Sequence, residues 1–287
     1  MAAVDYKALK NGGFMRQKQK ENFSLRLKVV GGNLTADQLM TIAGAAKKFG
    51  DGRVHLTSRQ GVEIPFIKLK DIDAVKAELL AGGVSTGVCG PRVRTVTACQ
   101  GSDICPSGCV ETYPLAVEIS ERYFGRELPH KFKFGVTGCQ NNCLKAEEND
   151  LGIKGGYLIK WDKSLCTLCG VCVKACRASA IKISKEALEL TEGACNNCGR
   201  CVKACPSEAW SGIPGYTLSF GGTFGNRIAK GREVVPITAD KAVLFRLSDA
   251  AVGFFAERAK PGERFRAAIE REGWDVFSAA MRRAYDG

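Results

Sequence analysis

Residues 137–153 read TGCQNNCLKAEENDLGI, in which Cys139 and Cys143 are separated by three residues. Upstream of this stretch, Cys99 and Cys105 are separated by five residues. These four belong to a total of 14 cysteines in 287 residues, an unusually high number for an enzyme of a reducing compartment. A secreted disulfide scaffold is the alternative, but residues 1–13 lack the apolar core of a secretory signal. We therefore expect a cytoplasmic protein whose cysteines hold metal.

Eight further cysteines form two runs with the spacing C-x2-C-x2-C-x3-C, which resembles that of bacterial two-cluster ferredoxins. In such a module, three thiolates of each run bind one [4Fe–4S] cluster and the fourth binds the other cluster. The first predicted cluster uses Cys166, Cys169, Cys172 and Cys205, and the second uses Cys195, Cys198, Cys201 and Cys176. Zinc is the alternative for thiolate ligands, although the doubled spacing favours iron–sulfur clusters. Arg177 departs from the ferredoxin pattern, which usually has proline at this position.

Three segments follow one another along the chain. We predict residues 1–159 as the N-terminal part of an α/β (α+β) core and residues 160–212 as an inserted ferredoxin-like module. Residues 213–287 would complete the core with a Gly-rich loop and C-terminal helices. The insert contains little aliphatic side chain, so its clusters would stabilise it, because metal-binding energy becomes folding energy.

Local patterns predict the elements of this core. Apolar and polar residues alternate over 24–30, which is typical of a strand. Thr35 and Gln38, three residues apart, predict the start of a helix that ends at Gly50. Residues 53–67 are typical of two strands joined by a turn at Gln60-Gly61, and a second helix is expected over 71–81. Further helices are expected at 248–259, 262–272 and 275–284.

The net charge is +12, from 42 Lys and Arg and 30 Asp and Glu. Basic proteins often bind polyanions, but no dense Lys/Arg run or aromatic-basic motif indicates nucleic acid. A bound anionic cofactor accounts equally well for the excess, since a four-thiolate cluster adds about two negative charges. No apolar run approaches the length of about 18 residues that spans a bilayer, so no membrane span is expected.

The C-x5-C and C-x3-C pairs, together with T-G-C-x3-C-x6-D-L-G-I, resemble the signature of sirohaem-dependent sulfite and nitrite reductases. Small anaerobic, dissimilatory-type sulfite reductases with an inserted ferredoxin are the most similar subgroup. The resemblance extends to HLTSRQG at 55–61, GPRVR at 90–94, LPHKFK at 128–133 and GGTFGNR at 221–227. It implies one α/β reductase repeat with sirohaem and three [4Fe–4S] clusters. The third cluster would be held by Cys99, Cys105, Cys139 and Cys143, and Cys143 would also bridge to the sirohaem iron.

Cationic side chains in these segments suit an oxyanion substrate, because fixed cations draw an anion to an electron-rich centre. Arginine offers a planar fork for oxyanions, and lysine can also relay protons. We assign Arg59 and Arg94 to anion binding, and Lys131 and Lys133 to anion binding and proton delivery. The two lysines share one face if their segment is extended, although surface lysines on an exposed strand are the alternative. Besides Cys143, the candidates for holding sirohaem are Arg53, Gln60, Arg92, Gly222 and Arg227.

Cys89 and Cys109 remain outside the predicted clusters. Both are expected to be buried small thiols, and Cys109 is an alternative to Cys105 as a cluster ligand. A structural role is favoured for His55, and His130 is assigned no role.

The leading hypothesis is a sulfite reductase that produces sulfide and takes electrons through the ferredoxin clusters. No nicotinamide or flavin fingerprint is evident, so a ferredoxin or a reductase subunit is expected as donor. The family often combines two repeats, whereas this chain has one, which predicts a homodimer or higher homo-oligomer with sites completed across the interface. Nitrite reduction to ammonia is an alternative. A non-catalytic electron-transfer subunit and a sirohaem-binding partner that needs a second subunit are further alternatives.

Overall fold

The structure is a computed structural model that describes residues 4–184 and 187–287. The chain divides into two compact units. The first unit comprises residues 1–98, 113–136 and 253–273, and the second comprises residues 99–112, 137–252 and 274–287. Both units contain helices and strands, which confirms the mixed α/β class. Neither unit begins or ends at the predicted boundaries between residues 159 and 160 and between residues 212 and 213. These boundaries therefore stay predictions.

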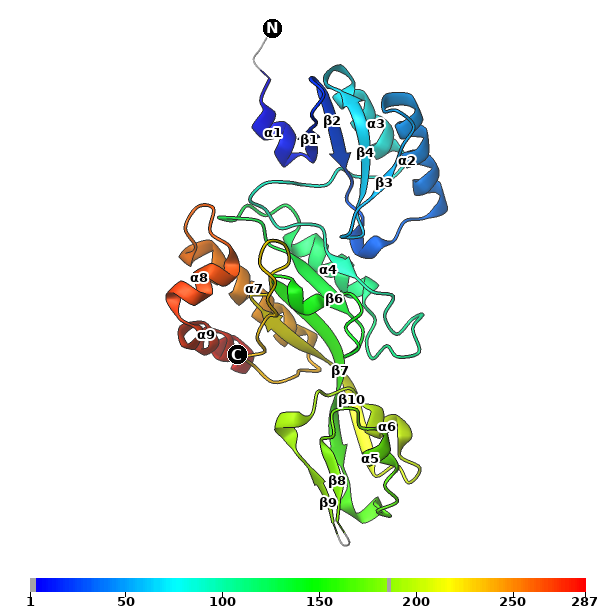
Figure 1. The fold of residues 1–287 in the computed structure, drawn as a ribbon, viewed down its shortest axis with the longest axis vertical. Coiled ribbons are helices and arrows are strands. Elements are labelled where there is room, and N and C mark those ends of the chain that lie inside the picture. Colours follow the sequence, from blue (N-terminus) through cyan, green and yellow to red (C-terminus); the bar gives the residue numbers. More distant parts are fainter. Residues whose placement is uncertain (1–3, 185–186) are drawn as a thin grey trace. The chain divides into compact units, whose positions relative to one another are not determined.

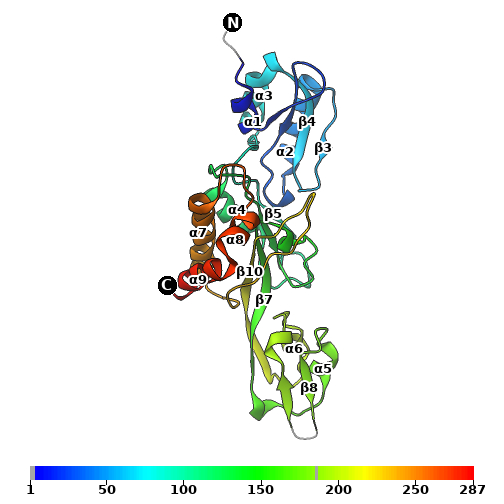
Figure 2. The same cartoon turned by 60° about the vertical axis from the view of Figure 1, so that its left-hand side comes forward.

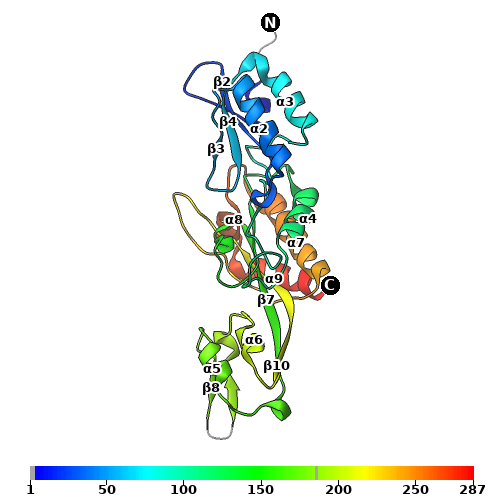
Figure 3. The same cartoon turned by 90° about the vertical axis from the view of Figure 1, so that its right-hand side faces the viewer.

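The first unit contains a four-stranded antiparallel sheet of order β1-β2-β4-β3. Helices α2 and α3 cover one face of this sheet (Figures 2 and 3). Leu25 and Ile64 from the strands and Ile42 and Val75 from the helices are fully buried in the shared core. The bounds are β1 Phe14–Arg16, β2 Asn22–Arg26, β3 His55–Leu56, β4 Val62–Lys68, α1 Tyr6–Asn11, α2 Ala36–Phe49 and α3 Ile72–Ala81.

The predicted N-cap at Thr35 is confirmed. Its hydroxyl accepts a hydrogen bond from the Gln38 N–H at 3.2 Å, and the Gln38 side chain accepts one from the Thr35 N–H at 3.1 Å. This reciprocal pair satisfies two donors that the first helical turn leaves open. The helix ends before Gly50, as the sequence predicts.

The strand predicted over residues 24–30 differs from the structure, in which β2 ends at Arg26. A 3-10 turn, η1 (Val30–Gly32), follows, and Gly31 and Gly32 have φ angles of 60° and 73°. These left-handed conformations, which glycine adopts readily, turn the chain out of the extended path. The turn predicted at Gln60-Gly61 is confirmed between β3 and β4, with Gln60 at a φ of 57°.

The first unit also contains β5 (Thr97–Ala98), which pairs in parallel with residues 135 and 136 of β6 (Phe134–Thr137). The remaining helices that contribute to this unit are α4 (Tyr113–Tyr123), the end of α7 (Lys241–Arg258) and α8 (Phe265–Glu272). Phe132 lies at the centre of an aromatic cluster, with ring centroids 5.2 Å from Phe134, 5.8 Å from Phe255 and 5.1 Å from Phe265. Burial of Phe132 fixes the segment that carries the two predicted lysines.

A long antiparallel hairpin organises the second unit (Figure 1). Strands β7 (Leu151–Trp161) and β10 (Trp210–Phe220) pair from Leu151↔Phe220 to Trp161↔Trp210. The chain between the two tryptophans forms a small module with its own core, in which Ile181, Leu188 and Trp210 pack against cysteines. Its elements are α5 Val171–Ala175, β8 Ile181–Ile183, β9 Leu188–Leu190 and α6 Arg200–Ala204, with 3-10 turns η4 Lys163–Leu165 and η5 Glu192–Ala194.

The three C-terminal helices are present with shifted starts. Helix α7 begins at Lys241, earlier than predicted, and the Asp240 carboxylate accepts a hydrogen bond from the Ala242 N–H at 2.7 Å. Helix α9 spans Trp274–Asp286. The other 3-10 turns are η2 Leu69–Asp71 and η3 Ala146–Glu148. Within residues 4–184 and 187–287, no helix combines the length and apolarity needed to cross a membrane.

Candidate active site and cysteine clusters

A cationic cavity of about 280 Å³ lies within the first unit. It is lined by all four residues predicted to bind the anion or deliver protons, namely Arg59, Arg94, Lys131 and Lys133. The two lysines flank the buried Phe132 and both line the cavity, as expected for an extended segment. The Arg59 guanidinium donates to the Thr95 carbonyl at 3.3 Å. Four cations from three separate segments are thus brought to one cavity.

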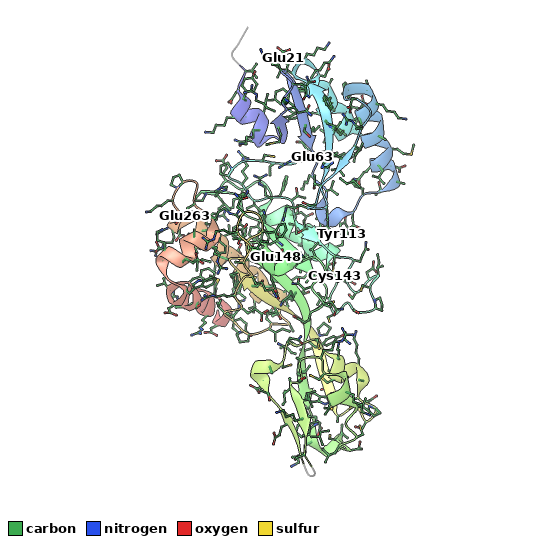
Figure 4. All side chains as sticks on the ribbon, viewed as in Figure 1. Glu21, Glu63, Tyr113, Cys143, Glu148 and Glu263 are labelled. Atoms are coloured by element: carbon green, nitrogen blue, oxygen red, sulfur yellow. The ribbon has the colours of Figure 1, made fainter. Side chains whose placement is uncertain are left out.

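Arg26 is a fifth cation in this cavity and is not among the residues predicted from the sequence. Its Nε lies 2.5 Å from Oε1 of Glu63, which also lines the cavity and is labelled in Figure 4. Burial acts to lower the pKa of Arg26, but the Cys89 sulfur and the Glu63 carboxylate outweigh it, so that the pKa is raised. The one available signal was an arginine placed between the apolar residues Leu25 and Leu27 in a strand pattern.

Two predicted sirohaem-binding residues of the first unit form ion pairs and are not among the residues that line this cavity. Arg53 binds Asp51, with an Nε–Oδ2 distance of 2.7 Å. Arg92 pairs with Glu127 and donates to the Gly125 carbonyl at 3.3 Å. Gln60 uses both ends of its amide on Ala98, donating to its carbonyl at 2.7 Å and accepting from its N–H at 2.9 Å. The sirohaem roles of these three residues stay predictions.

Cys99, Cys105, Cys139 and Cys143 come together in the second unit. Burial raises the pKa of the Cys139 thiol, and the nearby Cys99, Cys105 and Cys143 add to this effect. The Gly138 N–H donates to the Cys99 sulfur at 3.0 Å, which ties the two cysteine segments together. Cys143 is exposed and is labelled in Figure 4. An exposed thiol beside three partly buried ones fits a cluster ligand that is also open to a second group.

The eight cysteines between Trp161 and Trp210 line two separate small cavities. Cys166, Cys169, Cys172 and Cys205 line one, and Cys176, Cys195, Cys198 and Cys201 line the other. Each cavity thus combines three cysteines of one run with the last cysteine of the other, which is the grouping predicted from the spacing. Their roles as ligands stay predictions.

The two cysteine runs follow the same backbone path. Leu168 and Gly170 flank Cys169 with φ angles of 54° and 75°, and Asn197 and Gly199 flank Cys198 with φ angles of 56° and 67°. Such paired left-handed residues curl the loop around its cavity. In the described part of the chain, no three His, Cys, Asp or Glu side chains are grouped so as to hold a single metal ion.

A further cavity of about 300 Å³ lies between Cys139 and Cys198 in the second unit. Arg200, Lys203 and Gln140 also line it. Cys109 is buried close by, where burial raises its pKa to about 11 despite the charge of Lys203. Both Cys139 and Cys198 contribute to this rise, so Cys109 lies within electrostatic reach of the two predicted clusters.

The Gly-rich loop approaches the Cys143 segment closely at Gly222. A Cβ atom at this position would lie 2.0 Å from the Glu147 carbonyl oxygen and 2.4 Å from that of Asn149. Lys154 reinforces the contact, because its Nζ lies 2.5 Å from Glu147 and 3.0 Å from Glu233. Arg227, further along the same loop, is exposed.

Gly222→Ala is therefore expected to destabilise the protein by about 1–3 kcal/mol, since the backbone carbonyls must move. Chemical denaturation of the holoprotein measures the change. Gly253→Ala is the matched control, because a Cβ there meets no atom within 4 Å in helix α7. The control should change the free energy of unfolding by less than about 1 kcal/mol, in the stabilising direction. An equal change in the free energy of unfolding for both substitutions would contradict a stabilising role for the close approach at Gly222.

Comparisons with known proteins show a family whose models match most of the chain. Residues 89–286 match the family described as the nitrite and sulphite reductase 4Fe-4S domain, and residues 15–82 match the nitrite/sulfite reductase ferredoxin-like half domain. A coenzyme F420-dependent sulfite reductase of Methanocaldococcus jannaschii is 32% identical over 250 residues, covering 86% of this chain and 40% of that protein. One component of the anaerobic sulfite reductase of Salmonella typhimurium is 32% identical over 189 residues, covering 61% of this chain and 56% of that component.

Solved structures share the fold. The dissimilatory sulfite reductase I structure aligns with a TM-score of 0.74 at 18% identity, covering 91% of this chain and 69% of that one. The Mycobacterium tuberculosis NirA structure aligns with a TM-score of 0.69 at 17% identity, covering 98% of this chain and 47% of that one. The chain spans about half the length of the curated sulfite reductases that it matches.

Proposed function

The chain belongs to the nitrite and sulfite reductase family, and from this we propose that it reduces sulfite to sulfide in a six-electron reaction at a sirohaem coupled to a [4Fe–4S] cluster. The observation that carries the proposal is the cavity lined by Arg26, Arg59, Arg94, Lys131 and Lys133. Five cations in one cavity favour a small, highly charged anion, because attraction between charges strengthens where water is excluded.

The arginines of the cavity would bind the anion, and its lysines would supply protons. Arg59 and Arg94 present planar guanidiniums that match the oxygens of sulfite and remain charged at all working pH values. Lys131 and Lys133 would donate protons from Nζ to the oxygens that leave as water. Glu63 lies beside Arg26 and holds its guanidinium at the cavity wall. Removing these charges would weaken binding of the anion and slow its protonation.

The cysteines provide the sites for the redox groups. Cys99, Cys105, Cys139 and Cys143 would hold the coupled cluster, and Cys143 would also help to hold sirohaem. When bound, these groups would pass electrons from the external donor to the substrate. The close approach of Gly222 to Glu147 and Asn149 would support the Cys143 segment through the Gly-rich loop.

The inserted module would hold two further [4Fe–4S] clusters and serve as the electron relay. The cavity shared by Cys139 and Cys198 supports an order in which the Cys176/Cys195/Cys198/Cys201 site is next to the coupled centre. The Cys166/Cys169/Cys172/Cys205 site would then receive electrons from the donor. Cys169 is exposed, which suits this role.

The donor and the assembly are also proposals. We propose that a ferredoxin or a separate reductase subunit supplies electrons, because the sequence has no evident nicotinamide or flavin fingerprint. We propose a cytoplasmic homodimer or higher homo-oligomer whose active sites are completed across the interface. Solution scattering tests the assembly, and a fully active monomer would contradict it.

Nitrite reduction to ammonia is the second candidate, because nitrite reductases share the family and the cavity cations can bind either anion. The Escherichia coli nitrite reductase (NADH) large subunit is 31% identical over 145 residues, covering 50% of this chain and 17% of that protein. We expect kcat/KM for sulfite to exceed that for nitrite by about tenfold or more. Steady-state turnover of both anions with the same artificial donor measures this ratio. A higher value for nitrite would reverse the assignment.

A further inference from the structure

The short segment Val88–Gly90 wraps around the guanidinium of Arg94. Nη1 of Arg94 donates to the Val88 carbonyl at 3.1 Å, and Nη2 donates to the Gly90 carbonyl at 2.9 Å. Gly90 has a φ of 82°, and a Cβ there would lie 2.6 Å from Oδ1 of Asn11. Only glycine therefore fits the turn that directs both carbonyls at Arg94.

The side chain between these two carbonyls belongs to Cys89, which is 1% exposed. Its sulfur accepts a hydrogen bond from Nη1 of Arg26 at 3.4 Å. Burial lowers the pKa of Arg94, and the same sulfur acts in the opposite direction and raises it. Cys89 therefore binds Arg26 through its sulfur and belongs to the segment whose Val88 and Gly90 carbonyls bind Arg94, although it does not itself line the cavity.

The position between two guanidiniums suits a thiol for a physical reason. Two cations beside one buried segment repel each other. Burial is the main cause of the lowered pKa of Arg94, and the charge of Arg26 acts in the same direction. The Glu63 carboxylate already pairs with Arg26 at 2.5 Å, so a second carboxylate here would further weaken the attraction of the site for the substrate. A neutral thiol offers a weak acceptor without adding negative charge beside the two arginines. A methyl group would leave the Arg26 donor without this buried partner.

We propose that Cys89 is a positioning residue for the anion site, whose sulfur holds the guanidiniums of Arg26 and Arg94 in place at the cavity. This inference rests on the proposed function, since it assumes that the cavity binds sulfite. Cys89 does not touch the substrate, so its loss should affect binding of the anion far more than the rate of the bound complex.

The test compares Cys89→Ala with Cys89→Ser in the holoenzyme. Alanine removes the acceptor, whereas serine keeps an acceptor of similar size. We expect Cys89→Ala to raise KM for sulfite about five- to tenfold with kcat within about twofold of the wild type, and Cys89→Ser to remain within about twofold in both. Calorimetric titration with sulfite should show the same order of dissociation constants without any need for turnover.

Val84→Ala is the matched control, because Val84 is buried in the core of the same unit and does not line the cavity. It should lower the melting temperature and leave KM for sulfite unchanged. An unchanged KM in Cys89→Ala, or an equal rise in Cys89→Ser and Cys89→Ala, would overturn the proposal. A wild-type protein that binds sulfite but does not reduce it would overturn the proposed function alone. A wild-type protein that does not bind sulfite would overturn both.

Discussion

Lys131→Met is expected to lower kcat/KM for sulfite about 100- to 1,000-fold, the size of effect seen when one donor is removed from an anion-stabilising site. Methionine keeps most of the length of the side chain but removes both the charge and the proton that Nζ carries. The buried Phe132 next to it anchors the segment, so the backbone should stay in place. Steady-state kinetics with sulfite measure the loss.

Lys47→Met is the control for this substitution. Lys47 is exposed in the last turn of α2 and does not line the cavity. The Lys47→Met substitution should leave kcat/KM for sulfite within about twofold of the wild type, because single exposed charges are largely screened by solvent and salt. Equal losses in the two variants would show that general charge and not the cavity lysine controls turnover.

Cys105→Ala is expected to abolish sulfite reduction and to remove about five iron atoms per chain, four from one [4Fe–4S] cluster and one from the sirohaem. Cys105 lies among the thiols that act on Cys139, together with Cys99 and Cys143. Loss of one of four ligands should release the cluster on which the sirohaem depends. Iron analysis and the absorption spectrum of the purified protein measure the effect.

Cys109→Ala tests whether Cys105 or Cys109 is the cluster ligand. The Cys109 N–H donates to the Gly138 carbonyl at 2.7 Å, and its thiol donates to the Ser107 carbonyl at 3.8 Å. These contacts give Cys109 a role in packing the loop, so the variant should keep its iron and lose stability only. Loss of iron in Cys109→Ala, with iron retained in Cys105→Ala, would exchange the two assignments.

Much of this arrangement can be predicted from the sequence, because its signals are local. The spacing of the two C-x2-C-x2-C-x3-C runs predicts the exchange of the fourth cysteine, and the structure places Cys205 with the first run and Cys176 with the second. The Thr35–Gln38 capping pair also predicts the start of α2, because its two residues are only three positions apart in the sequence. Alternation around Phe132 predicts that Lys131 and Lys133 face one cavity.

Features that depend on tertiary contacts could not be predicted in this way. Arg26 enters the cavity because β2 pairs with β4, which brings Glu63 to it from 37 residues away. Cys89 has the pattern of an ordinary buried thiol, and only the folded chain places it against Arg26. Arg53 and Arg92 carry the charge expected of cofactor contacts, yet each pairs with a nearby carboxylate.

The most direct test is the absorption spectrum of anaerobically purified protein, recorded before and after sulfite is added to the reduced form. We predict tetrapyrrole bands above the broad iron–sulfur absorption, and these bands should shift when sulfite binds. Iron–sulfur absorption without any tetrapyrrole band, even after reconstitution with sirohaem, would contradict the proposed reductase and favour a non-catalytic electron-transfer protein.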